Sequence, residues 1–160
     1  MTNSIRKMRI KYLLAVTVFT LLVTACGSKS EKEQVSDQKN LVDSYLAVKD
    51  ALVATNASKA KAAATKFLEV NTNDQLTPDL QMIASNDDVA AQRKAFEGLS
   101  MKMYDMLRRR GSDTVLYKQY CPMAFNNKGA FWLAAEMEVN NPYFGDVMLH
   151  CGSVQEKIGG

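Results

Sequence analysis

The feature that most constrains this chain is a concentration of sulfur-bearing and aromatic side chains in residues 116–151. This stretch holds seven of the thirteen aromatic residues, the single tryptophan, Trp132, and the single histidine, His150. It also holds Cys121 and Cys151, each with a methionine close by in the sequence. Because aromatic side chains bury large apolar areas, we expect this stretch to form a compact cap that carries any chemistry the protein has.

The residues before this stretch have the periodicity of amphipathic helices. In the first of them, apolar residues recur at spacings of four, three and four, which places them on one face: Leu41, Tyr45, Val48 and Leu52. We predict helices over residues 39–54, 59–70, 77–84 and 87–110. The expected fold is mainly α: an antiparallel helical bundle with an aromatic-rich C-terminal cap that contains short extended segments.

Local signals set the expected boundaries of these elements. Thr77 and Pro78 are typical of a helix start, and Gly111 is typical of a helix end. The three arginines before Gly111 suit the negative end of the helix dipole, so we interpret them as a solvated helix end. Beyond Gly111 we predict an extended segment over residues 114–120, a turn over residues 126–129 and a short helix over residues 130–139.

The N-terminus has the pattern of a secretory signal. Four basic residues precede an apolar run over residues 12–23, which is too short to span a bilayer comfortably. The run ends in LVTAC, which is similar to the lipobox of bacterial lipoproteins and predicts lipidation of Cys26. We therefore divide the chain into a signal peptide (1–25), a lipidated N-terminus with a flexible tether (26–38) and a single domain (39–160). Acyl chains on Cys26 would hold the protein on a membrane.

Processing changes the charge of the protein. Removing residues 1–25 takes away four of the twenty basic residues and no acidic one, which leaves sixteen basic against seventeen acidic groups. The net charge of +3 therefore belongs to the precursor. A nearly neutral domain gives no electrostatic reason to expect nucleic acid as a partner.

Two sulfur pairs are the candidate site. Cys121 and Met123 form one pair, and Met148 and Cys151 form the other. Thiolates and thioethers are soft ligands that favour ions such as Cu(I) and Ag(I). If the chain brings the pairs together, their four sulfur atoms are sufficient to bind such an ion.

Other interpretations of these residues remain open. A secreted protein with two spare cysteines can form a structural disulfide, here closing a loop of about thirty residues and stabilising the fold by roughly 3–4 kcal/mol. Met123 and Met148 can equally be core residues that fill gaps. His150 can be a surface residue, a residue that supports the site, or a ligand.

The chain resembles a bacterial envelope family, domain of unknown function three-three-four-seven. The resemblance extends over residues 41–158 and rests chiefly on these segments: Tyr120–Ala124, Lys128–Ala130, Trp132–Leu133, Asn141–Gly145, Met148 and Cys151–Gly152. Members of this family occur as lipoproteins or secreted proteins, and as C-terminal modules of adaptor subunits in copper and silver efflux pumps. The resemblance implies a role in handling heavy metals and assigns the motif to Cys121, Met123, Met148 and Cys151, without His150.

Two functions follow as hypotheses. The first is an envelope lipoprotein, facing the periplasm or the cell surface, that binds Cu(I) or Ag(I) for sequestration or for delivery to an efflux system. Its partner would be an efflux-pump adaptor or another envelope protein. The alternative is an adaptor or interaction module without metal, in which Cys121 and Cys151 form a permanent disulfide. We do not expect an enzyme, because the sequence has one histidine and no Cys-x-x-Cys motif.

Overall fold

The computed structural model describes residues 30–160, and residues Val35–Gly160 form one compact unit. The predicted signal peptide and Cys26 lie outside the described residues. The elements follow in this order: α2 (Ser30–Val53), α3 (Ala57–Val70), α4 (Thr77–Ser85), α5 (Val89–Arg110), β1 (Leu116–Cys121), α6 (Ala124–Asn127), β2 (Ala130–Ala134), η1 (Gly145–Val147) and β3 (Ser153–Ile158). Over this range, no helix has both the length and the hydropathy needed to cross a bilayer.

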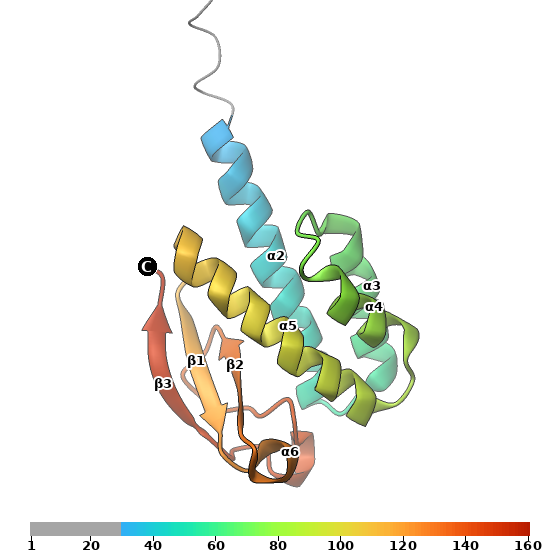
Figure 1. The fold of residues 1–160 in the computed structure, drawn as a ribbon. Helices are drawn as coiled ribbons and strands as arrows, with labels where there is room; N and C mark the ends of the chain where they lie inside the picture. The colour runs from blue at the N-terminus through green and yellow to red at the C-terminus, as the bar shows by residue number, and fades with distance from the viewer. Residues whose placement is uncertain (1–29) are drawn as a thin grey trace, which may run out of the picture. The chain divides into compact units, whose positions relative to one another are not determined.

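The chain is mainly helical, as the sequence predicts, and its C-terminal part is a small antiparallel sheet (Figure 1). The strand order is β2-β1-β3, so β1 pairs on both sides. Tyr120 of β1 faces Phe131 of β2 and Ser153 of β3, and the register with β3 shifts between Lys118 and Gln119. The extended segment predicted near residues 114–120 is therefore the centre of a sheet.

One prediction about the C-terminal elements was wrong, and one strand was missed. Residues 130–139, expected to be a short helix, form strand β2 followed by turns, and the third strand, β3, was not anticipated. The first helix also begins at Ser30, well before the expected start at residue 39, so part of the predicted tether is helical. In the strands, contacts with distant parts of the chain outweigh the local signal. The first helix extends past its predicted start, and helix ends are the least certain part of a helix prediction.

The caps of the helices agree largely with local chemistry. Asn56 accepts a hydrogen bond from the backbone N–H of Lys59 at the start of α3, and Asp88 accepts one from Ala90 at the start of α5. Gly111 ends α5 with φ of +81°, a conformation that glycine adopts without steric cost. Helix α4 differs, because Leu76 is its N-cap residue and no side chain caps it.

Helix α5 is the central element of the fold. It packs on α4 on one side and on β2 on the other (Figure 1). Phe96 of α5 is fully buried, stacks on Tyr45 of α2 with ring centroids 5.1 Å apart, and lies 6.0 Å from Tyr143. Tyr143 in turn contacts Trp132 of β2 at 5.9 Å in an edge-on geometry. These four aromatic rings join the helices to the sheet in one core.

The two tyrosines among these rings also form hydrogen bonds with the backbone at the free edge of β2. Strand β2 pairs only with β1, so the outward-facing groups of Phe131 and Leu133 need other partners. The Tyr143 hydroxyl donates to the Phe131 carbonyl at 2.6 Å, and the Tyr45 hydroxyl accepts from the Leu133 N–H at 3.0 Å. Tyr45 also shares a hydrogen bond with Ser100 at 2.8 Å. The sheet edge is thus covered by side chains from α2 and from the loop after β2.

We expect this arrangement to make the protein sensitive to alkaline pH. Burial raises the pKa of Tyr45 and of Tyr143 above the ordinary value near 10. A raised pKa means that the folded state holds the phenolic proton more tightly than the unfolded chain does. The stability that this provides is complete below pH 10 and is lost as the pH rises above it, at up to about 1.4 kcal/mol per pH unit for each tyrosine. Urea unfolding between pH 9 and pH 11.5 measures the slope, and Tyr45→Phe should reduce it by about half; an unchanged slope would contradict the assignment.

Candidate functional site

Cys121 is held at the end of the central strand. It lies opposite Ala130 of β2 and is fully buried. Cys151 lies just before β3 and is partly exposed. Antiparallel pairing of Tyr120 with Ser153 places the residues next to them side by side, and the two sulfur atoms lie 2.9 Å apart as free thiols. The two halves of the predicted sulfur site therefore meet through their cysteines.

The separation of the sulfurs lies between two chemical states. A disulfide bond holds its sulfurs about 2.05 Å apart. A tetrahedral metal with metal–sulfur bonds of about 2.3 Å holds two thiolates about 3.8 Å apart. From 2.9 Å, either state requires a movement of less than about 1 Å. The pair can therefore close into a disulfide or open around a metal without a large change in the sheet.

Glycine at position 152 allows this close approach. Gly152 has φ of +142°, and a Cβ atom there would lie 2.8 Å from the Tyr120 carbonyl oxygen and 3.1 Å from the Trp132 ring. Backbone oxygen cannot move aside cheaply, so any larger residue would push the segment away from β1. Because Gly152 directly follows Cys151, its contact with the backbone of β1 keeps the two cysteines together.

A buried asparagine organises the loop that carries Cys151. Asn141 is fully buried, and its Nδ2 donates to the Cys151 carbonyl at 2.7 Å. Its Oδ1 accepts from the Tyr143 N–H at 2.8 Å, and its own N–H donates to the Leu149 carbonyl at 2.7 Å. A further bond, from the Cys151 N–H to the Met148 carbonyl at 3.1 Å, closes the tight turn before β3. One side chain thus joins the beginning and the end of the loop.

We expect Asn141→Ala to destabilise the protein by about 1–3 kcal/mol, because the change leaves buried backbone groups without partners. Asn140→Ala, at the adjacent and partly exposed position, is the matched control and should have a much smaller effect. Urea unfolding of both variants measures the difference. Equal losses in the two variants would show that Asn141 does not hold the loop.

An arginine of α5 fixes the same loop from outside. Arg93 donates from Nε to the Pro142 carbonyl at 2.8 Å and from Nη2 to the Leu52 carbonyl at 3.1 Å. Nη2 also donates to Thr55 at 3.0 Å, and the Thr55 hydroxyl donates to Asp146 at 2.8 Å. Desolvation lowers the pKa of Arg93 from its ordinary value. The loop is therefore anchored to the end of α2 as well as to β1.

The electrostatics of the pair favour retention of a proton. The pKa of the Cys151 thiol is raised, first by its hydrogen bond with Cys121 and then by desolvation. Metal binding to thiols requires that they lose their protons. A soft metal would therefore compete with protons at Cys151, and its affinity would rise with pH.

The two methionines flank the cysteines but do not join the buried core. Met123 precedes α6, and 46% of it is exposed; Met148 follows η1 and is partly exposed. Among the described residues, neither methionine belongs to the buried cluster that contains Cys121. The structure thus brings two of the four predicted ligands together, and both methionines keep part of their surface exposed.

His150 is exposed beside Cys151. Its Nδ1 lies 2.8 Å from the Val139 carbonyl oxygen. A carbonyl only accepts hydrogen bonds, so Nδ1 carries the proton and Nε2 of the neutral ring is the nitrogen with a free lone pair. This contact orients the ring through the loop after β2. Within residues 30–160, no group of three or more histidine, cysteine and carboxylate side chains has the arrangement of a metal site.

Sequence analysis did not identify the residues that shape this site. Gly152, Asn141 and Arg93 act through contacts with distant backbone. Gly152 and Asn141 fall in segments that carry the family resemblance, but nothing in the sequence gives any of the three a role in the site. Lys49 is similar: it is buried in α2 and pairs with Glu136 in the loop after β2. Gln119, also buried, donates to the Glu136 and Glu138 carbonyls at 2.8 and 3.0 Å. A buried lysine or glutamine is recognisable only once its partners are in place.

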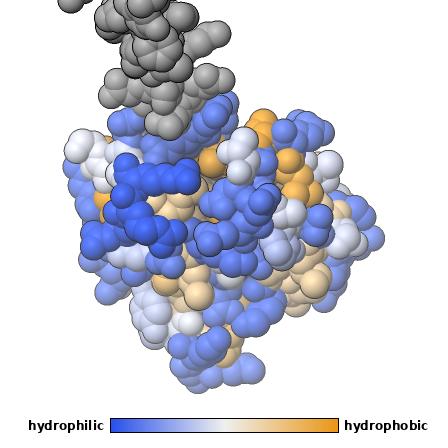
Figure 2. All heavy atoms as spheres, turned by 45° about the horizontal axis from the view of Figure 1, so that its top comes forward, coloured by the Kyte–Doolittle hydropathy of each residue, from blue (hydrophilic) through white to orange (hydrophobic). Residues whose placement is uncertain are grey.

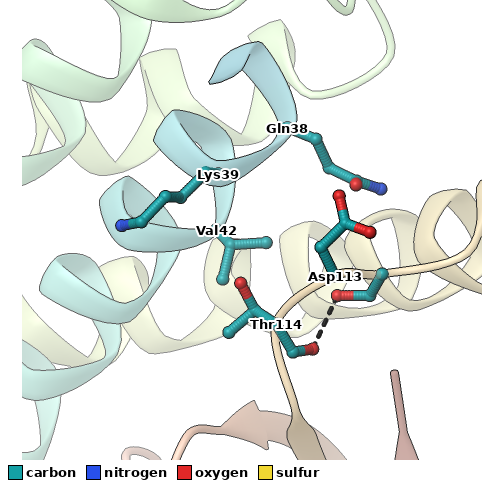
Figure 3. Close-up of a pocket in the computed structure, with 6 residues that line it drawn as sticks. Gln38, Lys39, Val42, Asp113 and Thr114 are labelled. Atoms are coloured by element: carbon teal, nitrogen blue, oxygen red, sulfur yellow. Dashed lines mark hydrogen bonds between the residues drawn. The ribbon is translucent and has the colours of Figure 1, made fainter. Parts of the chain in front are cut away.

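Some hollows of the described structure lie away from the cysteines, among them a cavity and an open groove. A cavity of about 180 Å³ lies between α2 and the segment after α5, lined by Gln38, Lys39, Val42 and residues 112–114 (Figure 3). The labelled side chains there are mostly polar, and Ser112 donates to the Thr114 carbonyl. An open groove between α3 and α4 includes Leu68 and Met82, and Figure 2 shows apolar residues gathered on that side of a largely hydrophilic face. Neither hollow contains a residue predicted from the sequence to act in function.

Comparison with known proteins identifies the helical part of the chain. Residues 41–114 match the model of the family described as "Protein of unknown function (DUF3347)". The match extends from α2 to the residues just after α5 and ends before β1, so the cysteines lie outside it. Searches of curated proteins and of solved structures found no match. In its helical segment, the chain is therefore similar to DUF3347, a family of proteins of unknown function.

Proposed function

We propose that this protein is an envelope lipoprotein that binds a soft metal ion, Cu(I) or Ag(I), for sequestration or for delivery to an efflux system. Cys121 and Cys151 are the central ligands. Met123 and Met148 are additional thioether ligands, and Cys26 carries the lipid. The observation that carries this proposal is the 2.9 Å contact between the two cysteine sulfurs, each preceded or followed closely by a methionine.

The chemistry of the four side chains supports this choice of metal. Sulfur ligands favour Cu(I) and Ag(I), whereas magnesium and calcium are bound by oxygen. Thioethers are neutral and need no deprotonation, so they remain ligands at low pH. Cys121, the inner ligand of the proposed site, is buried, whereas Met123 is exposed and Met148 is partly exposed. Such a site would take up and release its ion by ligand exchange at the exposed edge.

The architecture suits a protein that presents this site at one end. We interpret the helices as an antiparallel bundle, with the aromatic-rich C-terminal part as a cap on α5. The contact of Tyr104 on α5 with Phe131 on β2, with ring centroids 5.3 Å apart, supports this interpretation. Lys118 of β1 lies over both rings, 4.0 and 4.3 Å from their centroids, and adds cation–π contacts.

A competition titration tests the proposal. The chain is produced with Cys26→Ser, which leaves Cys121 and Cys151 as its only thiols. The reduced protein is titrated under anaerobic conditions against a Cu(I) chelator of known affinity. We expect one Cu(I) per chain to transfer to the protein, with a change in the fluorescence of Trp132, because its ring lies against Gly152. Retention of all the copper by the chelator would refute metal binding.

The same contact between sulfurs favours a second candidate function, an adaptor or interaction module in which Cys121 and Cys151 form a permanent disulfide. Thiol counting on protein taken directly from the cell envelope distinguishes the two. A disulfide that resists mild reductant and a protein that does not bind Cu(I) after full reduction would support the adaptor. Two free thiols, or a metal-bound pair, would support the metal-binding function.

A further inference from the structure

The two cysteines of the pair differ in their access to solvent. Cys121 lies on the central strand with none of its surface exposed. Cys151 lies in the segment before β3 and is partly exposed, next to the exposed side chains of His150 and Ser153. An external reagent can therefore approach Cys151 in the folded protein, whereas Cys121 is closed to it.

We propose that Cys151 is a site of thiol–disulfide exchange, at which an external disulfide enters, and that Cys121 is the buried cysteine that completes the reaction. The partner is an oxidant that carries an accessible disulfide. This inference goes beyond metal binding and does not depend on it, because it concerns the pair without metal.

The exchange takes place in two balanced steps. The deprotonated sulfur of Cys151 attacks one sulfur of the incoming disulfide, RSSR, forms a Cys151–S–S–R bond and releases RS⁻. The deprotonated sulfur of Cys121 then attacks the Cys151 sulfur, forms the Cys121–Cys151 bond and releases the second RS⁻. The cysteines lose two electrons and two protons, and the external disulfide gains both electrons to give two molecules of RSH.

The structure favours the second step over release of the mixed disulfide. The Cys121 sulfur lies 2.9 Å from that of Cys151, so the attacking atom is already in place. Asn141 holds the backbone at Cys151 through a hydrogen bond to its carbonyl, and Gly152 packs closely against the Tyr120 carbonyl of β1. Because the segment does not need to move far, the mixed disulfide should be short-lived.

Glutathione disulfide tests the order of the two cysteines. Full-length chains with Cys26→Ser are prepared reduced and free of metal, with Cys121→Ser, with Cys151→Ser, or with neither further change. We expect the Cys121→Ser chain to accumulate one glutathione adduct on Cys151. The Cys151→Ser chain should react at least about tenfold more slowly, because a fully buried thiol reacts only when the structure opens. The chain with both cysteines should form the internal disulfide and release two molecules of glutathione.

Intact-protein mass spectrometry over time follows all three reactions, and circular dichroism confirms that each variant is folded. In urea the two single variants should react at the same rate, which shows that burial causes the difference. Equal rates in the folded state, or a stable adduct on the chain with both cysteines, would overturn the proposal. Either result would leave the Cu(I) titration unaffected, so failure here is distinct from failure of the metal-binding function.

Discussion

Cys151→Ser is expected to weaken Cu(I) binding at least about 100-fold, because loss of groups that only support a ligand already costs 10–100-fold. Serine replaces a soft sulfur with a hard oxygen that Cu(I) disfavours. Cys121→Ser should have a comparable effect, because the two sulfurs lie 2.9 Å apart and, under the proposed function, would bind the same ion. Competition with a Cu(I) chelator, in chains that also carry Cys26→Ser, measures the change.

Methionine variants measure the contribution of the thioethers to Cu(I) affinity apart from that of the cysteines. Met123→Leu and Met148→Leu keep the size of the side chain and remove the sulfur, so each should cause a smaller loss of affinity than either cysteine variant. Met82→Leu is the matched control, because Met82 is also an exposed methionine but lies on α4. An effect of Met82→Leu equal to that of Met123→Leu would show that the predicted thioethers are not ligands. Unchanged affinity in both cysteine variants would contradict the site as a whole.

Tyr143→Ala is expected to destabilise the protein by about 3–5 kcal/mol, the range for loss of a large buried aromatic ring. The ring of Tyr143 contacts Phe96, Phe125 and Trp132 with centroids 5.2–6.0 Å apart, so its removal opens a cavity between α5, β2 and the loop. The variant also loses the hydrogen bond to the Phe131 carbonyl at the edge of β2. Urea unfolding at pH 7 measures the change.

A conservative variant divides this effect into its parts. Tyr143→Phe keeps the ring contacts and removes only the hydroxyl, so we expect a loss of about 1–3 kcal/mol from the unpaired carbonyl. Tyr117→Ala, at a partly exposed position of β1, controls for the removal of a tyrosine as such. If Tyr143→Ala cost no more than Tyr143→Phe, the aromatic contacts would contribute nothing to stability.

The stability of these aromatic contacts matters for the cysteines, because Tyr143 lies in the loop that leads to Cys151. Tyr143 lies between Asn141, which binds the Cys151 carbonyl, and Gly145, where a Cβ atom would come within 2.6 Å of Arg93. Loss of the Tyr143 ring should therefore also expose Cys121. In the glutathione experiment, a Cys151→Ser chain that also carries Tyr143→Ala would be expected to react faster than Cys151→Ser alone.

Local sequence determined the helices, because their signals lie within a few residues of each other. The apolar stripe of α2, the Asn56 cap of α3 and the Gly111 stop of α5 depend on backbone groups in the same turn. Sequence alone also identified the soft character of the candidate ligands. The family match agrees with this division, since it covers the helices and ends before the sheet.

Tertiary structure decided which residues form strands and brought the two cysteines into contact. Residues 130–139 are rich in helix-forming residues, yet Ala130–Ala134 form a strand because β1 pairs with them on one edge and two tyrosines bind the other. Cys121 and Cys151 are thirty residues apart in the chain and come together because Tyr120 pairs with Ser153 and Gly152 lies against β1. Sequence could name the sulfur atoms, but hydrogen bonds between distant strands set the distance between them, and no local pattern encodes that pairing.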